Sequence, residues 1–169
     1  MNYFELFEIP VQLKVDTTSL IPRFFELSRK YHPDYFVKDN PEAQSEALEK
    51  SALLNKAFKA FQNPEETIKY VLQLKGLSEE EEKYELTAEF LREVLEINEQ
   101  LMDTEDQSAI GNLQLTINKL QSDIYEPVKE IVEHYQEGFT SEKELLQVKE
   151  YYYKKKYLQR IQQQLTGMM

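Results

Sequence analysis

The amino-acid sequence predicts an all-α protein in which an N-terminal helical hairpin domain is joined to a C-terminal antiparallel three-helix bundle. The 169 residues include only four glycines and are rich in Glu, Leu, Lys and Gln, a composition that favours helix. Apolar residues recur at steps of three and four along most of the chain. Residues 1–76 carry ten basic and eleven acidic side chains, whereas residues 77–169 carry ten and twenty. We therefore expect a domain over 1–76, an acidic connection over 77–86 and a helical bundle over 87–169.

The composition also excludes several classes of protein. The absence of cysteine excludes disulfides, thiolate metal sites and thiol catalysis. No basic leader precedes an apolar run and no apolar stretch approaches membrane-spanning length, so the expectation is a soluble, cytoplasmic protein with no membrane contact. Ten basic against twenty acidic residues make the second half a poor candidate for binding nucleic acid or an anionic membrane.

Two helices are expected before residue 32. Asn2 is a suitable N-cap for a short helix through Phe7, and Asp16 or Thr17 begins a longer one that continues to about Tyr31. In the longer helix, four apolar residues at i, i+4, i+7 and i+11 share one face. They are Leu20, Phe24, Leu27 and Tyr31.

A polar turn, His32-Pro33-Asp34, follows this helix. Pro33 cannot continue a helix, so the turn displays one imidazole and one carboxylate between two helical segments. The tripeptide alone is a modest signal, since it arises by chance in about one chain of this length in a hundred. Three basic residues precede it, and by residue type alone they form either a solvated helix exterior or a basic docking face. They are Arg23, Arg29 and Lys30.

Two more helix starts follow the turn. Asn40-Pro41-Glu42 predicts a helix to about Phe61, and Asn63-Pro64 predicts another through Leu74, with Gly76 just after its end. We expect the buried side of the first of these helices to comprise Leu48, Ala52, Leu54, Asn55, Phe58 and Phe61.

The order of these features resembles the J-domain family over about residues 1–75. The matching segments are the basic-flanked Tyr31-His32-Pro33-Asp34, then Leu54-Asn55-Lys56-Ala57-Phe58, then Phe61-Gln62-Asn63-Pro64-Glu65, and Lys69-Tyr70. The resemblance implies that the domain docks on a DnaK-type chaperone and stimulates its ATP hydrolysis. The implied chaperone-binding residues are His32, Pro33, Asp34, Arg29, Lys30 and Arg23, although Glu26 lies on the same side as Arg23 and dilutes the charge there.

The second half begins with an amphipathic helix that has two apolar arcs. Thr87 is the expected N-cap of a helix over 88–103. One arc, suited to a core, comprises Phe90, Val94, Ile97 and Leu101, and the other comprises Leu91, Leu95 and Met102. Either the bundle wraps both arcs, or the second arc is an exposed docking surface rimmed by acidic residues.

Two further helices complete the predicted bundle. From Asp106 to Glu137 a seam of apolar residues steps by three or four, with a kink expected at Pro127 and a stop at Gly138. The seam comprises Ile110, Leu113, Ile117, Leu120, Ile124, Val128, Ile131 and Tyr135. A capping box, Ser141 to Glu144, starts the last helix, which reaches about Leu165.

A J-domain that opens with Asn-Tyr-Phe-x-Leu-Phe and continues into a wholly helical tail is similar to the HscB family of co-chaperones of iron-sulfur cluster assembly. The similarity implies that the bundle binds an IscU-type scaffold and delivers it to HscA, a DnaK-type chaperone. The implied scaffold-binding residues are Leu91, Leu95, Glu96, Glu99, Asp103 and Tyr153. Arg92 stands where the family usually has an apolar residue, and Tyr153 replaces a phenylalanine.

Other functions are weighed against this one. An enzyme would have to use His32, Asp34, Glu130 and His134, for which the sequence shows no convergent cleft, so we expect no catalytic residue, metal or cofactor. The segment Tyr151–Lys156 mixes aromatic and basic residues as nucleic-acid-binding segments do, but helical spacing separates the tyrosines. A J-domain co-chaperone with a different client, a general DnaK partner and an adaptor with no chaperone stay open, as does the oligomeric state.

Overall fold

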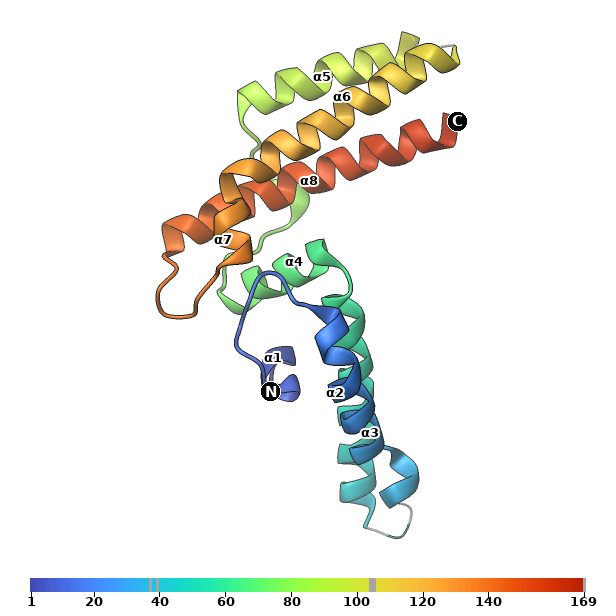
Figure 1. Ribbon diagram of the computed structural model, residues 1–169, viewed down its shortest axis with the longest axis vertical. Helices are drawn as coiled ribbons and strands as arrows, with labels where there is room; N and C mark the ends of the chain where they lie inside the picture. The colour runs from blue at the N-terminus through green and yellow to red at the C-terminus, as the bar shows by residue number, and fades with distance from the viewer. Residues whose placement is uncertain (37, 39, 104–105, 169) are drawn as a thin grey trace. The chain divides into compact units, whose positions relative to one another are not determined.

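The computed structural model describes residues 1–36, 38, 40–103 and 106–168, and every regular element among them is a helix (Figure 1). The chain divides into two compact units, residues 1–71 with 135–139 and residues 72–134 with 140–169. The predicted all-α class, with a helical hairpin domain and a three-helix bundle, is confirmed. The predicted boundaries at residues 76 and 86 stay a prediction.

The helices of the first unit begin where side-chain caps were predicted. They are α1 (Tyr3–Phe7), α2 (Thr17–Lys30), the 3₁₀ turn η1 (Pro33–Phe36), α3 (Pro41–Phe61) and α4 (Pro64–Leu74), the last of which extends into the second unit. Asn2 accepts a hydrogen bond from the Glu5 amide at 2.8 Å, and Asn40 accepts one from the Ala43 amide at 2.8 Å. These contacts satisfy amides that have no partner inside the helix, which fixes where each helix begins.

An aromatic core holds α1, α2 and α3 together. The Phe24 ring of α2 stacks on Phe58 of α3 at 4.3 Å, and Phe61 lies within 5.5 Å of both Phe4 and Phe7 of α1, measured between ring centroids. Aromatic pairs at these separations contribute beyond the apolar area that they bury. The α2–α3 hairpin is therefore braced at the end away from the polar turn.

The buried face of α3 differs from the predicted one. The buried residues are Ala47, Leu54, Ala57 and Phe61, Phe58 is half-buried, and Leu48, Ala52 and Asn55 are exposed. On a helix with 100° per residue, Leu48 lies about a quarter turn away from the stripe that Ala47, Leu54 and Phe61 define. The prediction is confirmed for Leu54 and Phe61 and wrong for Leu48, Ala52 and Asn55, because two other residues, Ala47 and Ala57, face the neighbouring helices.

The second unit contains the three-helix bundle. Its helices are α5 (Ala88–Asp103), α6 (Gln107–Tyr125), the 3₁₀ turn η3 (Glu126–Val128), α7 (Lys129–Glu133) and α8 (Glu142–Met168), and a further 3₁₀ turn, η2 (Glu81–Lys83), precedes α5. The long helices α5, α6 and α8 lie side by side (Figure 1). The predicted capping box is confirmed, since the Glu144 amide donates to the Ser141 hydroxyl at 3.1 Å and the Ser141 amide donates to the Glu144 carboxylate at 3.0 Å.

The core of the bundle follows the predicted seam through Val128, and Tyr135 is buried as predicted, but Ile131 departs from the prediction. Ile110, Leu113, Ile117, Leu120 and Ile124 are buried as expected. The 3₁₀ turn at Pro127 is wound more tightly than an α-helix, so the register changes after it. Val132 is buried in place of Ile131, and the helix ends at Glu133, four residues before the predicted end.

Candidate interaction surfaces

The polar turn after α2 holds two exposed side chains in a fixed arrangement. The Asp34 amide donates a hydrogen bond to Nδ1 of His32 at 3.2 Å, and an Asp34 carboxylate oxygen lies 3.6 Å from the same nitrogen. The side chain of His32 is 51% exposed and that of Asp34 is 85% exposed. The backbone of the turn is closed by a hydrogen bond from the Tyr35 amide to the His32 carbonyl at 3.1 Å.

This geometry determines what the turn presents to a partner. Because Nδ1 accepts the Asp34 amide proton, the imidazole proton belongs on Nε2, which is left as a donor. Among the contacts of the described residues, no lysine or arginine is paired with the Asp34 carboxylate. It is therefore free to receive a guanidinium or ammonium group from another protein.

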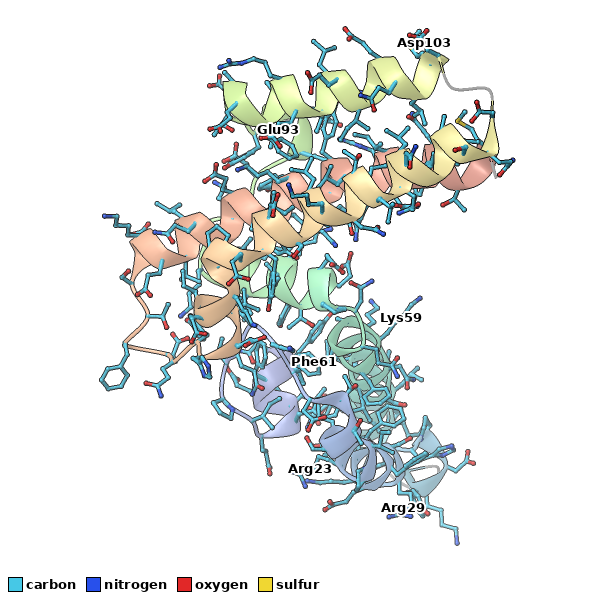
Figure 2. The ribbon with its side chains drawn as sticks, turned by 45° about the horizontal axis from the view of Figure 1, so that its top comes forward. Arg23, Arg29, Lys59, Phe61, Glu93 and Asp103 are labelled. Carbon is cyan, nitrogen blue, oxygen red and sulfur yellow. The ribbon has the colours of Figure 1, made fainter. Side chains whose placement is uncertain are left out.

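The basic residues of α2 are not equivalent. The Arg23 guanidinium forms ion pairs with Glu8 and, at 3.2 Å, with Glu26. Arg29 lies at the end of α2 that leads into the turn (Figure 2), and both Arg29 and Lys30 are exposed. The Lys30 ammonium lies 5.3 Å from the centre of the Tyr31 ring. Sequence reasoning identified Glu26 as a neighbour of Arg23 but missed Glu8, whose left-handed backbone at the end of α1 has φ 57°.

The helix α5 has one buried and one exposed apolar arc. Phe90, Val94, Ile97 and Leu101 are buried in the bundle. Leu91 is 43% exposed, Leu95 56% and Met102 86%. Within the described residues, the bundle therefore covers only the first arc. We use "α5 patch" for five exposed residues, Leu91, Leu95, Glu96, Glu99 and Asp103.

The acidic part of the α5 patch borders a groove between α5 and α6. The groove has a volume of about 780 Å³, and the buried Leu113 is among the residues that line it. Its acidic lining comprises Glu96, Glu99, Asp103 and Asp106, and no basic side chain is among the described residues that line it. Asp103 lies at the end of α5 (Figure 2). The α5 patch thus combines exposed leucines with a rim of carboxylates, and the exposed Arg92 lies on the same face of α5.

The structure does not bring Tyr153 onto the exposed α5 patch. Its side chain is only 4% exposed, and its ring stacks on Tyr84 with centroids 4.4 Å apart and planes 14° apart. The Tyr153 hydroxyl accepts a hydrogen bond from the Glu79 amide at 2.9 Å and donates one to the Glu79 carbonyl. We call the covering segment, residues 78–85, the strap.

Two ion pairs reinforce this contact between the strap and α8. The Lys149 ammonium lies 2.6 Å from the Glu79 carboxylate, and the Arg160 guanidinium lies 2.8 Å from the Glu81 carboxylate. Sequence reasoning missed both, because the partners are 70 or more positions apart. Opposite charge on residues 79–82 and on α8 was the available signal, but charge alone does not select partners.

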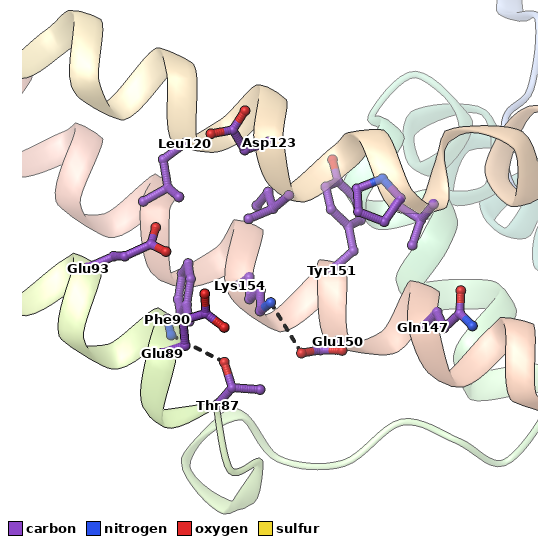
Figure 3. A pocket seen from close by; sticks show the side chains of 13 residues that line it. Thr87, Glu89, Phe90, Glu93, Leu120, Asp123, Gln147, Glu150, Tyr151 and Lys154 are labelled. Carbon is purple, nitrogen blue, oxygen red and sulfur yellow. Dashed lines mark hydrogen bonds and ion pairs between the residues drawn. The ribbon is translucent and has the colours of Figure 1, made fainter.

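Two further groups of side chains lie outside these surfaces. His134 and Glu130 lie 3.4 Å apart with both side chains exposed. A cavity of about 340 Å³ opens between α5, α6 and α8, where the Lys154 ammonium lies 3.2 Å from Glu150 and 5.4 Å from the centre of the Phe90 ring (Figure 3). Over residues 1–36, 38, 40–103 and 106–168, no group of three or more His, Cys, Asp or Glu is arranged to hold a metal ion.

Two other features bear on the class of partner. Tyr151, Tyr152 and Tyr153 are all buried, so none of them offers an exposed ring on which a base could stack. In the part of the chain that the structure describes, no helix is both long enough and apolar enough to cross a bilayer.

Comparison with known proteins finds several that are similar to this chain. Residues 86–166 match the HSCB C-terminal oligomerisation domain. The chain is 31% identical over 152 residues to the iron-sulfur cluster co-chaperone protein HscB of Mus musculus, an alignment that covers 89% of this chain and 64% of that protein. The chain thus spans a little under two thirds of the length of that relative.

Two solved structures are similar to the whole fold. The crystal structure of human co-chaperone protein HscB matches with a TM-score of 0.79 and 27% identity, covering 98% of this chain and 81% of the human one. The chaperone HscB from Vibrio cholerae matches over the full length of both chains with a TM-score of 0.69, and at 22% identity it supports the fold alone. The family match, the mouse relative and the human structure agree, and the chain is similar to HscB proteins along both of its units.

Proposed function

We propose that this protein is a co-chaperone of iron-sulfur cluster assembly that stimulates the ATPase of an HscA/DnaK-type chaperone and delivers an IscU-type scaffold to it. The observation that carries the proposal is the turn at His32, Pro33 and Asp34, in which both polar side chains are exposed and held in one geometry. A turn that is exposed and ordered suits recognition by another protein. In this role the ATP chemistry takes place on the partner.

The chaperone would dock on the turn and the adjoining end of α2. The Asp34 carboxylate is placed to pair with a basic side chain of the chaperone, and Arg29 and Lys30 would steer the domain toward an acidic surface. Such steering depends on unscreened charge, so the association should weaken as salt is added. Arg23 is a weaker contributor, because Glu8 and Glu26 already neutralise it.

The scaffold would dock on the α5 patch. Exposed leucines at its centre and carboxylates at its rim form an apolar hot spot surrounded by polar residues, which is the usual anatomy of a protein interface. The complementary surface would present apolar side chains flanked by Lys or Arg. Tyr153, the remaining residue that the family resemblance implies, lies beneath the strap in this conformation.

Steady-state ATP hydrolysis by a cognate DnaK-type chaperone tests both halves of the proposal. The rate is measured with and without this protein, and with and without an IscU-type scaffold. We expect stimulation by the protein alone and a larger, synergistic stimulation when the scaffold is present. No stimulation would overturn the chaperone half, and stimulation that ignores the scaffold would assign the bundle to another client.

The unequal basic residues of α2 give a sharper test. Combining Arg29→Ala with Lys30→Ala is expected to raise the concentration of this protein needed for half-maximal stimulation by roughly threefold to thirtyfold, at about 0.3–1 kcal/mol for each exposed charge. Arg23→Ala is the matched control, and we expect a smaller effect because its charge is already paired. Equal losses from the two variants would show that the internal ion pairs of Arg23 do not matter for docking.

A further inference from the structure

The strap lies against one face of α8 whose charge is opposite to its own. Residues 78–85 include five glutamates and one lysine. On α8, four residues at i, i+4, i+7 and i+11 share a face that combines basic and aromatic side chains. They are Lys149, Tyr153, Lys156 and Arg160. The strap therefore occupies this face as an acidic peptide would, although it belongs to the same chain.

The contact is anchored at three points. Two of the anchors are ion pairs, Lys149 with Glu79 and Arg160 with Glu81. The first is better shielded from water, since the Lys149 side chain is 13% exposed and the Arg160 side chain is 55% exposed. Between them lies Tyr153, which is bonded through its hydroxyl to both backbone groups of Glu79. Each anchor joins a strap residue to α8 directly.

The stacked pair of Tyr84 and Tyr153 closes the contact. Lys149 also lies over the Tyr84 ring, 5.6 Å from its centre. Burial raises the pKa of Tyr84, and the nearby carboxylates of Glu150 and Glu79 raise it further, so this phenol stays neutral at physiological pH. The neutral Tyr84 ring therefore covers the Tyr153 ring.

The strap is nevertheless a weakly held element. None of its residues is fully buried, and its only regular structure is η2, a single 3₁₀ turn. Ion pairs near the surface contribute little each, and segments with few buried apolar contacts open more readily than the core does. The helix beneath it, by contrast, is fixed by buried residues such as Val148 and Leu158. The strap can thus lift while the bundle stays folded.

We propose that the strap is an autoinhibitory latch, which covers Tyr153 and must lift before the bundle can present that ring to the scaffold together with the α5 patch. The inference rests on the scaffold binding proposed above. It also explains the role of a tyrosine where the family resemblance implies a phenylalanine. A phenylalanine ring would serve the interface equally well, but only the hydroxyl bonds to Glu79.

Two substitutions at position 153 separate the latch from the docking ring. Tyr153→Phe keeps the ring and removes both hydrogen bonds to the strap, so it should bind an IscU-type scaffold more tightly, as measured by titration calorimetry. If the strap is lifted in about 10% of native molecules, the Kd should fall by up to about tenfold. Tyr153→Ala removes the ring and should weaken binding. Glu79→Gln, which removes the ion pair with Lys149, should act in the same direction as Tyr153→Phe.

Tyr125→Phe is the matched control. Its hydroxyl belongs to the same bundle and interacts with Glu133 instead of the strap. Removing it should leave scaffold binding unchanged. Amide hydrogen exchange over residues 79–84 supplies a second readout. Exchange should be faster in Tyr153→Phe than in the native protein, and faster in the native protein once the scaffold is bound.

The outcomes distinguish failure of the latch from failure of scaffold binding. If the native protein binds the scaffold and depends on Leu91 and Leu95, yet Tyr153→Phe and Glu79→Gln bind no tighter, the latch is refuted and the α5 patch stands. If neither the native protein nor Tyr153→Phe binds, scaffold binding itself is refuted and the latch with it. Binding by Tyr153→Phe alone would support a latch that stays closed in the native protein.

Discussion

Replacing Asp34 by alanine is expected to abolish stimulation of the partner chaperone's ATPase while leaving the fold intact. The carboxylate is exposed, and among the described residues no lysine or arginine pairs with it. The hydrogen bond that orders the turn comes from the Asp34 backbone amide, which alanine retains. The free energy of unfolding should change by no more than about 0.5 kcal/mol. The ATPase rate should fall to the basal rate of the chaperone, as measured in the steady-state assay.

Asp16→Ala is the matched control for Asp34→Ala. Asp16 is also an exposed aspartate of the first unit, but it caps α2 by accepting a hydrogen bond from the Thr18 amide at 3.1 Å. Losing such a cap costs about 1 kcal/mol, so this variant should lower the thermal midpoint and still stimulate the chaperone. If Asp34→Ala lowered the midpoint as much as Asp16→Ala does, the loss of stimulation would have a structural cause.

Combining Leu91→Ala with Leu95→Ala should weaken scaffold binding strongly and cost little stability. Truncating a hot-spot residue costs about 1–2 kcal/mol or more, so the pair should raise the Kd by roughly thirtyfold to a thousandfold. Both side chains are exposed, so each substitution should change the free energy of unfolding by no more than about 0.5 kcal/mol. Titration calorimetry and urea denaturation measure the two quantities on the same protein.

Ile97→Ala is the control on the same helix, and it should reduce stability without weakening scaffold binding. Ile97 lies in the buried arc of α5, and removing a buried side chain of this size costs about 2–5 kcal/mol. Its truncation should therefore reduce stability without touching the α5 patch. A stability loss of that size for the Leu91 and Leu95 pair would place them in the core, and unchanged scaffold affinity would exclude the α5 patch as the docking surface.

Helix starts were predictable because their cause is local. Asn2, Asp16, Asn40 and Asn63 each accept a hydrogen bond from an amide two or three residues later, and Thr87 does the same at 3.3 Å. The buried arc of α5 was predicted residue by residue for the same reason, since its periodicity is regular. The exposure of Leu91 and Leu95 was one of two alternatives, and only the positions of the neighbouring helices decided it.

The departures from prediction have causes that a local pattern does not contain. The face that α3 buries depends on the rotation of α3 against α2, which Phe24 and Phe58 fix across 34 positions. The path after Pro127 depends on how many residues a 3₁₀ turn takes up. Tyr153 was placed by family resemblance alone, and the strap that covers it is joined to it by contacts between residues 74 positions apart.

The strap is tethered at both ends, through α4 on one side and α5 on the other, and this gives it an advantage over any free competitor. A segment on a short tether meets its own binding face at an effective concentration of the order of millimolar. A separate acidic peptide at cellular concentration would seldom displace it. A partner that first binds the α5 patch would be held near α8, and its own effective concentration there would then be comparable with that of the strap. Only a protein that binds both the α5 patch and the α8 face beneath the strap would then reach Tyr153.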